Sequence, residues 1–325
     1  MISRRMFLAA GAATLTSGQA ALAQSGYPDH NMRLVVGYPA GGGVDIVARL
    51  VIDPMRDALG QPVIVENRAG AAAMIAAQAV AKAGSDGHTL LMAAAGEIAV
   101  NKHLYKEKMT YQPETELVPI ALAGIVPCLV VVADTSPVRT PADLIAYARA
   151  NKGKLTYSSS GVGNPQHLAG ELMNKMAGTD VQHVPYRGST PAVTDIAAGA
   201  VTMSFSSLGA ALPLIQAGKI RPVAVTSRER MPQLPDVAPL SDALPGYELL
   251  NWFAMFAPAA TPQPILARLT DVMPKIMQRP DIKEQLAIQG IVSRNMSDAE
   301  LRAFVRSESD KFAKIIQDAN ITLGN

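Results

Sequence analysis

Four segments of this sequence combine glycine, hydroxyl and small residues where a predicted strand leads into a predicted helix. The first, residues 38–45, contains Ala40, three consecutive glycines (Gly41, Gly42 and Gly43) and Asp45. Glycines allow a tight turn and a close approach of the backbone to a ligand. The N-terminus of the next helix offers free N–H groups and partial positive charge, which suits an anion. The alternative is a plain turn in which Asp45 is the N-cap of the helix.

The other three segments follow the same logic. Residues 157–165 contain Ser160, Gly161 and Asn164, residues 185–191 contain Gly188, Ser189 and Thr190, and residues 94–97 contain Ala95, Gly96 and Glu97. In open α/β sheets such loops lie at the carboxyl ends of the strands, where ligands bind. Together the four segments predict a polar cleft lined mainly by backbone groups.

Familiar catalytic motifs are missing from the sequence. It has no Gly-x-Ser-x-Gly elbow and no Ser-x-x-Lys motif, and no two of its five histidines are paired at metal-ligand spacing on a helix. We therefore expect no catalytic residue, metal ion or cofactor. Ser160 with His167 is the one nearby nucleophile–base candidate, which leaves a hydrolase as an alternative. Otherwise His167 either reaches a ligand or makes a local hydrogen bond near the helix start.

The elements that position these segments alternate regularly along the chain. Short runs rich in β-branched residues alternate with stretches that have a helical pattern. The predicted strands are at 33–38, 63–65, 89–92, 129–133, 155–157, 182–184 and 202–204. The predicted helices are at 45–59, 71–83, 141–150, 165–177, 191–198 and 209–217. Residues 261–324 read as mostly helical. This alternation predicts βαβ units and an α/β fold with mainly parallel sheets flanked by helices.

The N-terminus has the three parts of an export signal. Arg4 and Arg5 precede an uncharged run at 6–17, and small residues precede a predicted cut near Ala23. The apolar run is too short for a membrane anchor, which needs about 20 residues. The arginine pair predicts a twin-arginine signal, with an ordinary secretion signal as the alternative. We therefore expect residues 1–23 to be removed and the protein to be periplasmic.

Composition narrows the possible partners. The chain of 325 residues has 29 basic and 27 acidic residues, and loss of Arg4 and Arg5 leaves 27 of each. This charge balance does not indicate a nucleic-acid-binding protein. Cys128 is the only cysteine, so no internal disulfide is possible, and we expect a buried structural thiol. The length that remains after loss of residues 1–23 is typical of a protein with two lobes.

Ordered motifs along the whole exported part make the chain recognisable. They are Tyr27-Pro28, residues 38–49, 59–70, 86–91, 155–163, 167–171 and 184–188, Pro191-Ala192 with Asp195, and residues 217–219 and 234–237. In these motifs the sequence resembles the Bug family of periplasmic receptors, which are TctC-like proteins serving tripartite tricarboxylate transporters.

The resemblance implies a two-lobed Venus-flytrap fold of the type II periplasmic-binding-protein kind. Lobe 1 would comprise residues 24–125 and 251–325, and lobe 2 residues 126–250, with chain crossings near 123–127 and 251–257. A small organic carboxylate would lie between the lobes, held by backbone amides and waters at residues 40–43 and at Ser160-Gly161. The loops at Ala95-Gly96 and 188–190 would determine ligand specificity, and Asp195 and Ser206 match positions near the cleft. The implied partner is an integral-membrane permease, and we expect a monomer.

Some residues depart from the family pattern. Val44 stands where a hydroxyl residue is frequent, and His88 stands where tyrosine is frequent. Glu97 puts an acid in a loop that would sort ligands, and an unpaired buried charge is costly. Either Glu97 faces solvent, or the ligand has a cationic or amide end. Arg187 either meets a second carboxylate or lies at the surface. A ligand sensor that reports to a signalling partner remains a further alternative.

Overall fold

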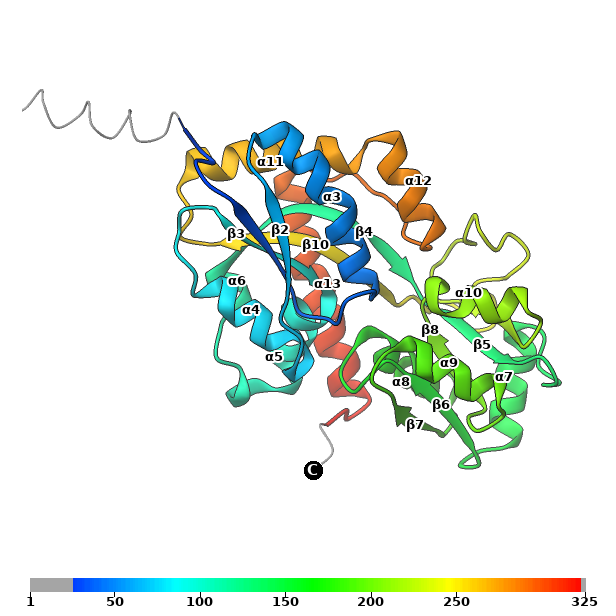
Figure 1. Ribbon diagram of the computed structural model, residues 1–325. Coiled ribbons are helices and arrows are strands. Elements are labelled where there is room, and N and C mark those ends of the chain that lie inside the picture. Colours follow the sequence, from blue (N-terminus) through cyan, green and yellow to red (C-terminus); the bar gives the residue numbers. More distant parts are fainter. Residues whose placement is uncertain (1–25, 323–325) are drawn as a thin grey trace, which may run out of the picture.

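The computed structural model describes residues 26–322, and in it the chain forms two five-stranded sheets, one in each of two lobes (Figure 1). The export signal predicted at residues 1–23 lies outside the described residues. Within the described part, no helix is both long enough and apolar enough to serve as a membrane span.

The sheet of the first lobe has the strand order β2-β1-β3-β10-β4. Its strands are β1 (Met32–Val36), β2 (Val63–Asn67), β3 (Thr89–Ala94), β4 (Leu117–Pro127) and β10 (Leu250–Pro258). β1 pairs in parallel with β2 and β3, whereas β10 runs antiparallel to both β3 and β4. Only β10 therefore opposes the common direction of the sheet.

The sheet of the second lobe repeats this arrangement in the order β7-β6-β8-β5-β9. Its strands are β5 (Leu129–Ala133), β6 (Leu155–Ser159), β7 (Val181–Pro185), β8 (Met203–Ser206) and β9 (Ile220–Val225). Here β6 is parallel to β7 and β8, and β5 is antiparallel to β8 and β9. β6 thus occupies the place in its sheet that β1 occupies in the first.

Helices flank both sheets (Figure 1). In the first lobe they are α3 (Gly43–Leu59), η1 (Ala71–Ala73), α4 (Met74–Ala81), η2 (Gly96–Val100), α5 (Asn101–Leu104), η3 (Lys106–Lys108) and α6 (Pro113–Glu116), followed at the C-terminus by α11 (Gln263–Met277), α12 (Pro280–Ile288) and α13 (Asp298–Asp318). In the second lobe they are α7 (Pro141–Ala150), α8 (Pro165–Ala177), α9 (Ser189–Ala197), α10 (Leu208–Gln216) and η4 (Leu240–Asp242).

The predicted alternation and the mainly parallel α/β sheets are confirmed, with one local difference. The stretch predicted as a helix at 71–83 begins as η1, in which Ala71, Ala72 and Ala73 have positive φ angles of 46°, 52° and 67°. Alanine strongly favours the right-handed helix, so tertiary packing overrides local preference here. Gly37 permits this packing, because a Cβ on it would lie 2.4 Å from the Cβ of Ala73.

The chain passes between the two sheets at Cys128 and again after Thr226. Cys128 is the single residue between β4 and β5, and it is almost fully buried, as predicted. Its amide donates to the hydroxyl of Thr226 (2.8 Å), and its carbonyl accepts from the Thr226 amide (2.9 Å). The carbonyl of Thr226 in turn accepts from the Leu249 amide (3.1 Å), just before β10. The two crossings are therefore bonded to each other.

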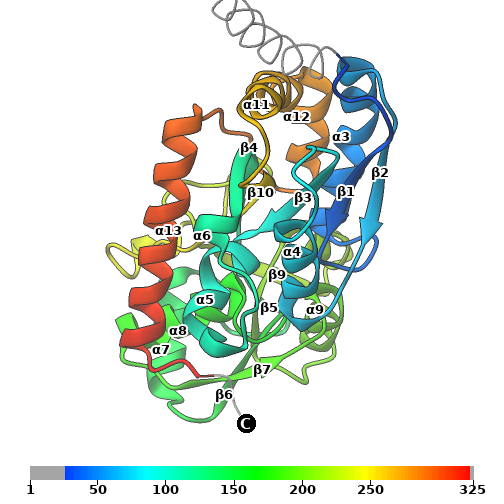
Figure 2. The same cartoon turned by 90° about the vertical axis from the view of Figure 1, so that its left-hand side faces the viewer.

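Helix α13 makes a third connection between the lobes. It runs along the molecule and contacts both β4 and α8 (Figure 2). Phe312 and Ile315 of α13 share one apolar cluster with Leu168 and Met173 of α8. Lobe motion therefore requires α13 to slide or tilt on one of its two neighbours.

The crossing at Thr226 can be tested by removing its hydroxyl. Thr226→Val leaves the buried Cys128 amide without an acceptor, which should lower the free energy of unfolding by about 1–3 kcal/mol. Urea denaturation measures this loss, and hydrogen exchange should show reduced protection of the Cys128 amide. Thr226→Ser keeps the acceptor and should keep the protection. Equal protection in both variants would contradict this role for Thr226.

Candidate functional site

The glycine segment after β1 forms an uncapped helix start. Gly42 is the N-cap of α3, and no side chain within the described residues caps the helix there. Gly41 has a φ of 80°, a conformation that favours glycine. Gly41 and Gly43 are exposed. The first amides of α3, from Gly43 onward, lack acceptors inside the helix and so remain available to an anion.

Asp45 shapes this segment from within the lobe. Its carboxylate accepts hydrogen bonds from the Gly41 amide (2.8 Å), Arg49 Nε (2.8 Å) and Asn67 Nδ2 (2.8 Å), and the residue is 1% exposed. Burial by itself raises its pKa, but these hydrogen bonds prevail and hold the pKa of Asp45 below the ordinary value. Asp45 is therefore neither the N-cap nor a group that faces a ligand; it holds the glycine turn in place.

Glu97 lies inside the first lobe with its own partners. It is fully buried, its carboxylate accepts from the Tyr38 hydroxyl (2.7 Å) and the Ala94 amide (2.8 Å), and its carbonyl accepts from Tyr111 (2.6 Å). Burial raises the pKa of Glu97 to about 7. Of the two interpretations offered for Glu97, exposure to solvent is wrong. A cationic or amide end on the ligand is not required either, because Tyr38 and Ala94 already satisfy the carboxyl. Ala95 and Gly96 are likewise buried.

The serine segment of the second lobe is organised by Gln166. The Ser160 amide donates to Gln166 Oε1 (2.9 Å), and Gln166 Nε2 donates to the Ser189 hydroxyl (3.0 Å). Asn164 donates to the Ser160 hydroxyl (2.7 Å) and caps α8 by accepting from the His167 amide (3.0 Å). The turns after β6 and β7 therefore form one hydrogen-bonded unit in which Ser160 and Gly161 are half-buried.

The remaining predicted residues of the second lobe divide into accessible and internal groups. Gly188 is the N-cap of α9, without a side-chain cap among the described residues, and Thr190 is exposed. Asp195 accepts from the Tyr186 hydroxyl (2.5 Å), and this hydrogen bond raises the pKa of Tyr186 to about 12. Ser206 is fully buried at the end of β8. Arg187 is exposed.

The arrangement of serine and histidine does not suit nucleophilic catalysis. His167 Nδ1 accepts from the Gly163 amide (3.1 Å), whereas Ser160 is bonded to Asn164. The serine that does contact a histidine is Ser159, whose hydroxyl lies 2.7 Å from Nε2 of His183. Ser159 is fully buried, and burial lowers the pKa of His183 to about 3 and that of His167 to about 4. The two stacked imidazoles, with ring centroids 3.9 Å apart, are neutral and structural.

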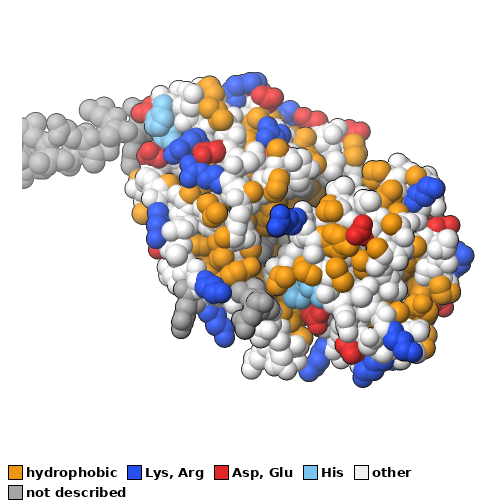
Figure 3. Space-filling model, turned by 60° about the horizontal axis from the view of Figure 1, so that its bottom comes forward, with side chains coloured by type: hydrophobic (Ala, Val, Ile, Leu, Met, Phe, Trp, Pro, Cys, Tyr) orange, Lys and Arg blue, Asp and Glu red, His pale blue; other side chains and the backbone are white. Residues whose placement is uncertain are grey.

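The accessible loops of the two lobes face the boundary between the lobes. The turn from β1 to α3 points toward the lobe that holds α8 and α9 (Figure 1), and a furrow with few charged side chains runs along the boundary (Figure 3). The lobes touch beside this boundary, because a Cβ on Gly163 would lie 2.8 Å from Leu104 and a Cβ on Gly290 2.7 Å from Leu208. The structure thus directs the glycine turn and the serine unit toward a common region.

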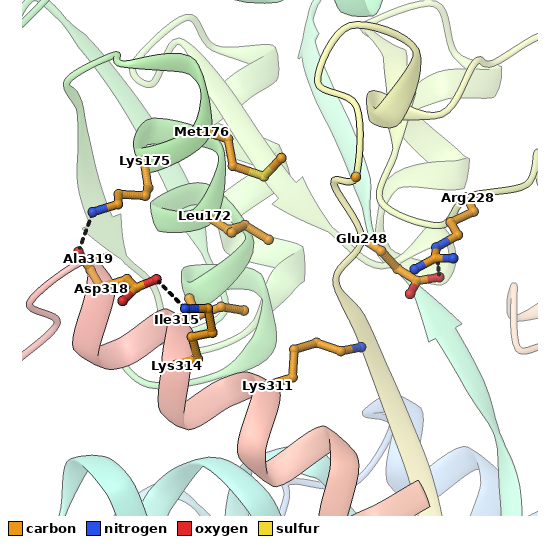
Figure 4. A pocket seen from close by; sticks show the side chains of 11 residues that line it. Leu172, Lys175, Met176, Arg228, Glu248, Lys311, Lys314, Ile315, Asp318 and Ala319 are labelled. Atoms are coloured by element: carbon orange, nitrogen blue, oxygen red, sulfur yellow. Dashed lines mark hydrogen bonds and ion pairs between the residues drawn. The ribbon is translucent and has the colours of Figure 1, made fainter.

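A separate cavity lies between α8 and α13 and contains none of the predicted residues (Figure 4). Two ion pairs lie in its lining, Arg228 with Glu248 (3.4 Å) and Lys314 with Asp318 (3.3 Å), and Lys175 donates to the Asp318 carbonyl (3.1 Å). The cavity lies where α8 meets α13, apart from the glycine and serine segments.

Several residues that organise the site were not identified from the sequence. Each makes a hydrogen bond to a residue distant in the sequence. Gln166 bonds to Ser189, 23 positions away, Asn67 to the Tyr38 carbonyl, 29 positions away, and Tyr38 to Glu97, 59 positions away. The sequence gives no signal for such contacts, because nothing in local spacing reports which distant loop lies beside a side chain. All three lie in or beside recognised motifs, Tyr38 and Asn67 within them and Gln166 at the second position of α8, but the motifs do not report these contacts.

Sequence comparison identifies the family. The profile of the tripartite tricarboxylate transporter family receptor (TctC) matches residues 47–321, so the chain belongs to this family of solute receptors. The chain is also similar to the protein BugT of Bordetella pertussis, at 30% identity over 322 residues covering 98% of each chain. The resemblance to Bug-type receptors is therefore confirmed.

Solved structures share the fold along nearly the whole chain. Rpa4515 of R. palustris, determined with adipate, is 34% identical with a TM-score of 0.84, covering 91% of this chain and 99% of that one. MatC (Rpa3494) of Rhodopseudomonas palustris, determined with bound malate, is 28% identical with a TM-score of 0.79, covering 89% and 100%. These similarities confirm the two-lobed periplasmic-binding-protein arrangement.

The burial of Glu97 predicts a specific pH dependence of stability. Because its folded-state pKa of about 7 exceeds the ordinary 4.5, Glu97 contributes stability that is fully present below pH 4.5 and is lost as the pH rises through about 7. Glu97→Gln cannot ionise. The free energy of unfolding of the wild type minus that of the variant should fall by about 3 kcal/mol between pH 4 and 8. Urea denaturation across this range measures it, and a constant difference would contradict the assignment.

Proposed function

We propose that this protein is a periplasmic solute receptor that binds a small organic dicarboxylate between its two lobes and delivers it to the membrane permease of a tripartite transporter. The observation that carries the proposal is the exposed, uncapped start of α3, which faces the boundary between the lobes. The residues that would form lobe 1 are 24–125 with 251–325, and those of lobe 2 are 126–250.

Two sets of backbone donors are suited to the two ends of such a ligand. One carboxylate would accept hydrogen bonds from the first amides of α3, where the helix dipole favours negative charge. The other would meet the first amides of α9, which has no side-chain cap at Gly188, in the opposite lobe. The turn at Ser160-Gly161 would lie beside it, with its own amides bonded to Gln166 and Ser159. Neutral amides hold an anion without burying a second charge, and hydrogen bonds to charged groups contribute about 1.5–3 kcal/mol each.

The relatives support the ligand class. The titles of the two similar structures name adipate and malate, and both compounds are dicarboxylates. The inward position of Asp45 and Glu97 removes the repulsion that free carboxylates would exert on a diacid. Closure would use the bonded crossings at Cys128 and Thr226 as a hinge. Membership in this receptor family supports the proposed delivery to a permease and the proposed export to the periplasm.

Calorimetry on ligand-stripped protein tests the proposal. We expect one site per chain for at least one C4 to C6 dicarboxylate, and weaker binding of the matching monocarboxylate because only one set of amides would be engaged. Monocarboxylate affinity equal to that of every diacid would contradict a two-ended site. Absence of binding across the panel would contradict the proposed function as a whole.

Gly42→Val tests the glycine turn directly. Gly42 has a φ of −75°, which any residue adopts, and a Cβ there would lie 3.3 Å from the Pro39 carbonyl, so the fold should adjust. A side chain at the N-cap covers the first amides of the helix. We expect the Kd for the best diacid to rise by about 10- to 100-fold, as the loss of one such hydrogen bond implies.

The matched control is Gly84→Val, at an exposed glycine whose Cβ would lie 3.7 Å from Asp86 and whose loop precedes β3 instead of following a strand. Its affinity should equal that of the wild type. If both variants keep full affinity and the wild-type melting temperature, the glycine turn is not part of the site.

A further inference from the structure

Two histidines and an aspartate meet at the far end of the first lobe. Asp29, His30 and His88 bring one carboxylate oxygen and two imidazole nitrogens within 4.8 Å of one another. Nδ1 of His30 lies 2.6 Å from Asp29 Oδ1, and Nε2 of His88 lies 3.2 Å from the same oxygen. The two imidazole rings are stacked, with centroids 3.7 Å apart. Residues 58 positions apart in the sequence thus converge on one point.

His88 is held in a fixed orientation by its own loop. Its amide donates to Asp86 Oδ1 (2.9 Å), and its Nδ1 lies 3.1 Å from the Asp86 carbonyl oxygen. A carbonyl oxygen only accepts, so Nδ1 carries a proton, and the lone pair of a neutral His88 ring would be on Nε2. A hydrogen bond from the second ring nitrogen to a backbone carbonyl is the usual support of a metal-ligating histidine.

Nε2 of His88 is a buried nitrogen without a hydrogen-bond partner among residues 26–322. The residue is 6% exposed, and its nearest acceptor, Asp29 Oδ1, does not form a hydrogen bond with it. A lone pair on nitrogen and a carboxylate oxygen 3.2 Å apart repel each other unless a cation lies between them. In a tetrahedral zinc site with bonds of 2.0–2.1 Å, ligand atoms lie about 3.3 Å apart, which matches this separation. His30 Nδ1 lies closer to the same oxygen, at 2.6 Å in a hydrogen bond, so His30 would have to turn out of its stack on His88 to bind the same ion.

The segments that carry these side chains are bonded together independently of the cluster. The hydroxyl of Tyr27 donates to the Gly87 carbonyl (2.8 Å), and the Arg33 amide donates to the His88 carbonyl (2.7 Å). The cluster lies before β1 and β3, at the end of the sheet remote from the second lobe (Figure 1). The backbone that carries the cluster is therefore held in place, and it is separate from the glycine turn, which follows β1.

We propose that Asp29, His30 and His88 bind a divalent zinc ion, with His88 Nε2 as the buried ligand and solvent completing the coordination. Two imidazoles and one carboxylate are a donor set that Zn²⁺ uses readily. The ion would fasten the segment before β1 to the loop before β3. This site was not expected from the sequence, because its two histidines are not neighbours on a helix.

Calorimetric titration of chelator-treated, tag-free exported chain with ZnCl₂ tests the site. We expect saturable binding of one Zn²⁺ per chain and a higher melting temperature with Zn²⁺ present. Asp29→Asn changes an exposed side chain that the fold does not need, and His88→Gln removes the buried ligand. Each should weaken Zn²⁺ binding by at least about tenfold, whereas binding of a dicarboxylate should be unchanged.

The matched control is His103→Gln, which alters a half-buried histidine bonded to Ser309 on another face and should leave Zn²⁺ affinity unchanged. Absence of saturable Zn²⁺ binding would overturn the proposal. Full affinity in either Asp29→Asn or His88→Gln, or an equal loss in His103→Gln, would also overturn it.

Discussion

The bonded pair of crossings at Cys128 and Thr226 is the constraint on which the arrangement of the molecule depends. Only one residue separates β4 from β5, so the two sheets cannot be displaced far from each other. The amide of Cys128 and the hydroxyl of Thr226 satisfy each other in a fully buried position, which fixes the second crossing against the first. Because both sheets have the same strand order, fixing the crossings brings corresponding loops toward one boundary.

The charges near that boundary follow a common rule. Each acidic group among the candidate residues has a partner: Asp45 with Arg49, Glu97 with Tyr38, and Asp195 with Tyr186. A buried charge without partners is costly, whereas one that accepts several hydrogen bonds is tolerated. At the two helix starts the backbone at the glycines is neutral, and the exposed charge in these loops is the positive one of Arg187. A carboxylate can meet such a surface without competing with a fixed negative charge.

The sequence was sufficient for much of the fold. Runs of valine, isoleucine and leucine at 33–36 and 129–133 are typical of strands buried on both faces, and the structure has β1 and β5 there. The break before Met74 was not predictable, because three alanines with positive φ contradict local preference and depend on contact with Gly37. The division into lobes at residues 125 and 251 remains a prediction.

By itself, the sequence determined which loops can turn tightly and leave the backbone accessible, since glycine at 41–43 and 188 acts through its own conformational freedom. That the helix starts there have no side-chain cap was decided by the structure. It also determined the family, because ordered motifs extend along the chain. Only the tertiary structure decided what the polar side chains do. Glu97, His167 and Ser206 looked available and are buried, while Gln166 and His88 gained roles from partners 23 and 59 residues away. Partners so distant in sequence are chosen by packing, and spacing along a chain carries no information about them.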